Sequence, residues 1–99
     1  MKNLNAFLKE SQETQSETLQ SEIGQILRPF GSIRNGFKKK FDFDKIDELM
    51  TQNGWNYIDN EEDENRQPYK IYKWEKVDYI CYLYVNTSTN TIKNFQIMN

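Results

Sequence analysis

The feature that most constrains the fold is a series of β-type segments in the second half of the chain, joined by short connections. Residues 69–75, 78–85 and 91–97 are rich in tyrosine, isoleucine and valine, which favour strands. A shorter strand is expected over residues 55–59. Short connections join neighbouring strands in antiparallel order. The sequence therefore predicts a four-stranded antiparallel meander.

The first half carries the periodicity of amphipathic helices instead. One apolar stripe recurs at helical spacing and consists of Leu19, Ile23, Ile26, Leu27 and Phe30. The following proline is expected to end this helix near Leu27. A second helix is expected over residues 43–52, with Asp42 as its N-cap and Asn53-Gly54 as its stop. The predicted fold class is α+β, with two or three N-terminal helices packed on one face of the sheet.

A polar run near the N-terminus separates two apolar clusters. Residues 11–18 are entirely polar, whereas Leu4, Phe7 and Leu8 before them lie at helical spacing. Either one long helix has a solvated middle, or two short helices flank a loose linker. The chain of 99 residues is expected to form one domain, with residues 1–18 as a loosely packed segment.

Composition indicates a cytoplasmic protein. Cys81 is the only cysteine, so the chain cannot form an intramolecular disulfide, which fits a reducing compartment. The first residues lead into no apolar stretch of a signal peptide, and no segment approaches the roughly 20 apolar residues of a membrane span. We therefore expect no membrane association.

Residues that usually carry catalysis or hold metals are missing. The chain has no histidine, and its four glycines are isolated, so neither a histidine-based triad nor a phosphate-binding loop is formed. Residues 59–65 alternate acidic and amide side chains as a calcium loop does, but Glu64 occupies the position of the turn glycine and Lys70 that of the bidentate glutamate. Cys81 lies in the most apolar strand and is expected to behave as a small hydrophobe. The expectation is no enzyme, no metal and no cofactor.

Aromatic residues of the predicted sheet form the leading candidate for a binding surface. If the hairpin turns around Glu75-Lys76-Val77, alternation places four rings on one face, edged by two lysines. The predicted partner-binding residues are Tyr72, Trp74, Tyr82, Tyr84, Lys70 and Lys73. Tyrosine and tryptophan are frequent anchors of protein interfaces. The alternative is that the N-terminal helix covers these rings, which then serve as core packing.

A basic segment gives a second candidate. It contains Arg34, Lys38, Lys39 and Lys40, and lysines near exposed tyrosines can track a single-stranded phosphate backbone while bases stack. Residues 46–68, which follow, carry seven acidic residues against one arginine, which opposes this interpretation. Binding of single-stranded nucleic acid or RNA is therefore the alternative function.

The chain as a whole resembles the small accessory proteins of phages and mobile elements, including anti-defence inhibitors such as anti-CRISPR proteins. The resemblance lies in its size, its acidity, its abundance of Asn, Lys, Ile and Tyr, and its lack of catalytic residues. It implies a protein that acts by occupying a surface on a larger host or viral protein. The predicted function is a non-enzymatic protein-binding module, and the resemblance implies that it inhibits a larger host protein. The sequence leaves the identity of the partner and the oligomeric state open.

Overall fold

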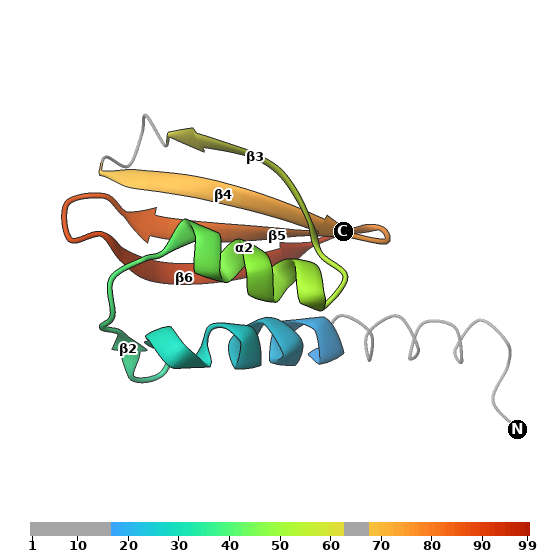
Figure 1. Ribbon diagram of the computed structural model, residues 1–99, viewed down its shortest axis with the longest axis horizontal. Coiled ribbons are helices and arrows are strands. Elements are labelled where there is room, and N and C mark those ends of the chain that lie inside the picture. The colour runs from blue at the N-terminus through green and yellow to red at the C-terminus, as the bar shows by residue number, and fades with distance from the viewer. Residues whose placement is uncertain (1–16, 63–67) are drawn as a thin grey trace, which may run out of the picture.

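The computed structural model describes residues 17–62 and 68–99, which form an α+β fold with two α-helices and a four-stranded antiparallel sheet (Figure 1). The first helix, called the N-terminal helix here, is described over residues 17–26. The elements that follow are the 3-10 turn η1 (Arg28–Phe30), the strands β1 (Gly31–Ser32) and β2 (Gly36–Phe37), the helix α2 (Phe43–Gln52), and the strands β3 (Asn56–Glu62), β4 (Tyr69–Lys76), β5 (Tyr79–Asn86) and β6 (Thr91–Met98). The α+β class is therefore confirmed, with two helices in the described part of the chain.

The large sheet has the strand order β3-β4-β5-β6, and each strand is antiparallel to its neighbour. The predicted meander is confirmed. Both edge strands carry a β-bulge, because Ile58 in β3 and Lys93 in β6 have no partner in the register. Bulges at sheet edges disrupt the regular backbone ladder and hinder pairing with another chain.

The helix boundaries follow from capping and periodicity, as predicted. Asp42 caps α2, where its Oδ1 accepts a hydrogen bond from the backbone N–H of Lys45 at 3.2 Å. Gly54 ends the connection after α2 with a φ of +88°, a backbone conformation that favours glycine. In the N-terminal helix, the side chains of Ile23 and Ile26 are buried in the core.

Both helices pack on the same face of the sheet, which we call the covered face (Figure 1). The ring of Phe43 in α2 lies 4.9 Å from Tyr57, 5.5 Å from Tyr72 and 6.0 Å from Trp74, measured between centroids. The Nε1–H of Trp74 donates to Oδ1 of Asp47 at 3.0 Å, so the buried indole has a polar partner on the helix.

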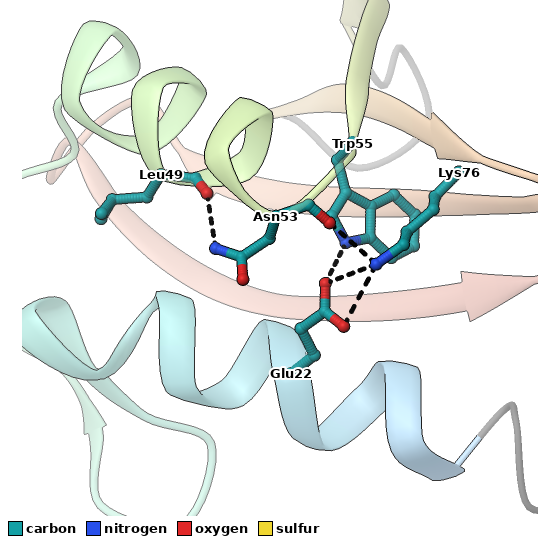
Figure 2. Close-up of polar contacts among 5 residues, drawn as sticks. All are labelled: Glu22, Leu49, Asn53, Trp55 and Lys76. Carbon is teal, nitrogen blue, oxygen red and sulfur yellow. Dashed lines mark hydrogen bonds and ion pairs between the residues drawn. The ribbon is translucent and has the colours of Figure 1, made fainter.

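The N-terminal helix is attached to the sheet through one carboxylate (Figure 2). Oε1 of Glu22 accepts hydrogen bonds from Nε1 of Trp55 and from Nζ of Lys76, each at 3.0 Å. Nζ of Lys76 also donates to the backbone oxygen of Asn53 at 2.8 Å. This cluster joins the N-terminal helix, the end of α2 and the last residue of β4.

Two predicted boundaries are corrected. β3 begins at Asn56 and continues through Glu62, so acidic residues expected in a loop after Asp59 belong to the strand. In this extension Asn60, Glu61 and Glu62 pair with Tyr72, Ile71 and Lys70 of β4. Residues 31–37, for which the sequence predicts no strand, contain the small β1–β2 hairpin, in which a Cβ atom on Gly31 would clash with the backbone oxygen of Gly36.

Part of the N-terminal prediction lies outside the described residues. This applies to Leu4, Phe7 and Leu8 and to the polar run as far as Ser16. Glu17 and Thr18, expected in the loosely packed segment, already belong to the N-terminal helix and are exposed.

Candidate functional site

The β4–β5 register decides which aromatic residues share a face of the sheet. The hairpin turns at Val77-Asp78, and the strands pair Trp74 with Cys81 and Lys73 with Tyr82. A turn centred on Lys76 had been expected, and a slip of one residue transfers one strand's side chains to the other face. The prediction of a single patch of four rings is therefore wrong.

The covered face holds three of the six predicted binding residues. Trp74 is 0% exposed, and Tyr72 is half-buried with its ring 4.8 Å from that of Phe41. Nζ of Lys70 lies 5.3 Å from the centroid of the Tyr72 ring. Tyr72 and Trp74 are thus part of the core packing. This agrees with the alternative that a helix covers these rings, but the covering helix is α2 and not the N-terminal helix.

The other three predicted residues, Lys73, Tyr82 and Tyr84, lie on the opposite face of the sheet, which we call the open face. No helix of the described residues packs on this face (Figure 1). Reading the register across β4, β5 and β6, its rows are Ile71–Tyr84–Asn94, Lys73–Tyr82–Gln96 and Glu75–Ile80–Met98. Both tyrosine rings are half-buried among their neighbours, and Met98 is 48% exposed.

The open face carries a negative charge in spite of its central lysine. Nζ of Lys73 lies 3.2 Å from Oε2 of Glu61 and 3.6 Å from Oδ1 of Asp59, both on β3. Its hydrogen bond to Glu61, with a smaller contribution from the charge of Asp59, raises the pKa of Lys73 above its ordinary value of 10.5. Glu75 is exposed and forms no ion pair within the described part of the chain. Asp59 and Glu61 therefore flank the ammonium group of Lys73, and Glu75 adds a third carboxylate to the same face.

Sequence reasoning missed Ile71, Ile80 and Met98, which complete the apolar part of the open face, and the carboxylates of β3 that flank it. Ile80 shares the strand parity of Tyr82 and Tyr84 in β5, whereas the β4–β5 register places Ile71, and the β5–β6 register Met98, on the same face. The expectation for Cys81 is confirmed, since its side chain is buried in the core and burial raises the pKa of its thiol to about 12.

The predicted basic segment lies apart from these tyrosines. Arg34 lies in the tip of the β1–β2 hairpin, and Lys38 and Lys39 follow β2; all three are exposed. The backbone of Lys40 forms an isolated bridge with Thr91 of β6. Because β6 separates this segment from β5 in the sheet order, the basic residues are not interleaved with Tyr82 and Tyr84.

A groove of about 240 Å³ lies between the N-terminal helix and α2 and is lined by Glu22, Gln25, Ile26, Pro29, Leu49 and Asn53. Two of its polar side chains already have partners: Glu22 binds Trp55 and Lys76, and Nδ2 of Asn53 donates to the backbone oxygen of Leu49 at 2.8 Å (Figure 2). We read this groove as part of the helix attachment.

Neither a metal site nor a membrane span is found among residues 17–62 and 68–99. No three acidic or cysteine side chains come together there as possible ligands, and neither helix has the length and apolarity needed to cross a bilayer. The chain matches no protein-family model, no curated protein and no solved structure. Function must therefore be argued from the surfaces described above.

Proposed function

We propose that the protein is a non-enzymatic protein-binding module whose open face docks on a larger protein. The observation that carries this proposal is a sheet face on which no helix of residues 17–62 and 68–99 packs, and on which Tyr82 and Tyr84 lie near Ile71, Ile80 and Met98. Tyrosines with apolar rings and polar tips are well suited to anchor an interface. A contiguous apolar patch on a small domain commonly marks an interaction site.

The charge of the open face specifies the chemistry of the partner. Asp59, Glu61 and Glu75 outnumber Lys73, so a partner surface with arginine or lysine side chains around aliphatic groups is complementary. Nucleic acid is disfavoured on this face because its phosphates would meet these carboxylates.

The mode of action that we propose is occupation of the partner's surface, in the cytoplasm, without chemistry by this protein. The lack of histidine and the reducing compartment indicated by Cys81 support this interpretation. We further propose that the protein is an inhibitor encoded by a phage or mobile element. The resemblance of the whole chain to such proteins in size and composition supports this proposal.

The first test compares two charge reversals of equal size on opposite sides of the molecule. Glu75→Lys changes the open face, whereas Glu48→Lys makes the same change on the exposed side of α2. Wild-type protein would capture partners from an extract of the native host, and the affinity of each variant for the identified partner would then be measured. We expect a loss of about tenfold or more for Glu75→Lys only, equivalent to about 1.4 kcal/mol.

The second test addresses the rings. Tyr82→Ser/Tyr84→Ser should abolish binding of the identified partner, whereas Tyr82→Phe/Tyr84→Phe keeps the apolar area and should retain most of it. Thermal unfolding of all variants checks that the fold is intact. Equal affinities for the Glu75 and Glu48 variants, or unchanged binding by the serine pair, would show that the partner does not use the open face.

A further inference from the structure

Two segments far apart in the sequence form one basic region around the β1–β2 hairpin. Residues 28–41 contain five basic residues and no acidic one, and residues 87–99 contain one lysine and no acidic residue. The hairpin strand β2 lies close to β6. The backbone N–H of Phe41 donates to the oxygen of Asn90 at 2.7 Å, and Nζ of Lys40 donates to the oxygen of Thr89 at 3.1 Å.

These six residues are called the basic surface here, and they are Arg28, Arg34, Lys38, Lys39, Lys40 and Lys93. All six are exposed, and none forms an ion pair within residues 17–62 and 68–99. A protein with a net charge of −2 thus concentrates six cations, none of them in an ion pair with a described residue, on two adjoining segments. Lys93 lies at the bulge of β6 and has no partner residue on β5. It is distant from the other five residues in the sequence, and the contact between β2 and β6 brings its segment next to theirs.

We propose that the basic surface binds the phosphate backbone of double-stranded nucleic acid, independently of the open face. Exposed cations that form no ion pair within the described residues suit backbone contacts, since each phosphate contact releases condensed counterions. The carboxylates of Asp42 and Asp44, which follow Lys40 in the sequence, mark the boundary of this surface. The acidic residues elsewhere do not prevent this, because charges are screened over about 10 Å at 0.1 M salt.

The side chains around these cations favour a duplex over single strands. Binding of single strands relies on exposed aromatic rings that stack with bases. In the two segments Phe30 and Phe37 are buried, and Phe41 and Phe95 are half-buried. The basic surface therefore offers positive charge but no exposed aromatic ring on which a base could stack. In this respect it differs from the single-strand site predicted from the sequence, which combined lysines with exposed tyrosines.

The same side chains disfavour the other anionic partners. The large apolar side chains that are exposed in these two segments are Ile33, which is 59% exposed in the hairpin tip, and Met98 near the C-terminus. One aliphatic side chain is a weak membrane anchor, since stable insertion of a peripheral element needs a broader apolar face. Protein interfaces typically have an apolar centre surrounded by a polar rim. The basic residues do not surround such a centre, which disfavours a protein partner.

The test measures binding of a fluorescently labelled DNA duplex to the full-length chain by anisotropy over a series of salt concentrations. We expect the logarithm of the affinity to fall linearly with the logarithm of salt, with a slope of about −3 to −5 if most of the six cations contact phosphates. Lys38→Gln/Lys39→Gln should make this slope shallower by about 2, and Lys93→Gln by about 1.

A matched control separates local contacts from net charge. Gln20→Glu/Gln52→Glu lowers the net charge by the same amount as Lys38→Gln/Lys39→Gln, but at exposed positions on the two helices. This control should leave the slope unchanged, and so should Tyr82→Ser/Tyr84→Ser, which tests the open face. The two proposals can therefore fail separately.

Several outcomes would overturn the proposal. They are a lack of duplex binding even at low salt, tighter binding to a single strand of equal length, an equal loss of slope in the glutamine control, and binding to anionic phospholipid vesicles but not to the duplex. Unchanged binding by Lys93→Gln together with Lys38→Gln/Lys39→Gln would overturn it as well.

Discussion

The covered and open faces of the sheet carry the same kinds of aromatic residue and use them differently. On the covered face, Tyr72 and Trp74 lie beneath α2, and the indole N–H of Trp74 donates to Asp47. On the open face, Tyr82 and Tyr84 have no helix above them in the described part of the chain. The number of aromatic residues in a strand therefore does not tell whether it builds a core or a surface.

The difference also concerns how polar tips are satisfied. Each buried tryptophan donates to a carboxylate on a helix, Trp55 to Glu22 and Trp74 to Asp47, so burial leaves no indole N–H without an acceptor. The hydroxyl of Tyr84 lies 3.4 Å from Oε1 of Gln96, an exposed side chain at the edge of the sheet. The covered indoles thus have partners on the helices, whereas the Tyr84 hydroxyl has its partner on the surface of the sheet.

The largest expected effect is a contrast in stability between the two faces. Trp74→Ala should lower the free energy of unfolding by about 3–5 kcal/mol, because it removes a fully buried ring and leaves Asp47 without its donor. Tyr82→Ala should lower the free energy of unfolding by about 1 kcal/mol or less, because this ring contacts only cross-strand neighbours on the open face. Urea unfolding monitored by circular dichroism measures both values. Similar losses for the two variants would contradict the distinction between the faces.

Most of the secondary structure was predictable because local signals agree with the fold. The apolar stripe of the N-terminal helix, the Asp42 cap, the alternation in β5 and the strand-favouring residues of β4 and β6 each point to the element that forms. Antiparallel order followed from the short connections between strands. These features depend on residues close together in the sequence.

The binding surface was only partly predictable because it depends on register. The β4–β5 turn contains Val77 with a φ of +57°, a conformation that β-branched residues rarely adopt, so the sequence gives no turn signal there. The acidic end of β3 was mistaken for a loop because the attraction of Asp59 and Glu61 to Lys73 acts across strands. The addition of Lys93 to the basic surface likewise requires the contact between β2 and β6.

A smaller effect on the free energy of unfolding should appear at alkaline pH. It arises from Cys81 on the covered face and tests how completely that face is buried. Burial raises the pKa of this thiol from 9.0 to about 12, so between these values the unfolded chain loses a proton that the folded chain retains. The contribution is fully present below pH 9, and the free energy of unfolding should fall by up to about 1.4 kcal/mol per pH unit as the pH rises through this window.

Other groups also titrate in this range, so the measurement is a difference between two proteins. Denaturant unfolding of wild type and Cys81→Ala at several pH values isolates the thiol, because tyrosines and lysines are common to both. The alanine variant should start less stable and lose stability with a shallower slope. Parallel slopes would show that the thiol titrates in the folded protein as it does in the unfolded chain.

The smallest expected effect concerns the attachment of the N-terminal helix, which keeps one face covered. Glu22→Ala should lower the free energy of unfolding by about 1–2 kcal/mol, because Trp55 loses its acceptor and Lys76 its ion-pair partner. The cost stays moderate because the Glu22 side chain is partly exposed, with 24% of its area accessible, and solvent screens the pair. Glu17→Ala, on an exposed turn of the same helix, is the matched control and should change stability little.

Glu22→Gln separates the two functions of this carboxylate. The amide oxygen can still accept from Nε1 of Trp55, but the attraction to the ammonium of Lys76 is lost, so the variant should fall between wild type and Glu22→Ala. Because only the ion pair is screened by salt, the gap between wild type and Glu22→Gln should narrow in concentrated sodium chloride, whereas the gap between Glu22→Gln and Glu22→Ala should persist. If Glu22→Ala costs no more than Glu17→Ala, apolar packing of Ile23 and Ile26 alone holds the helix on the covered face.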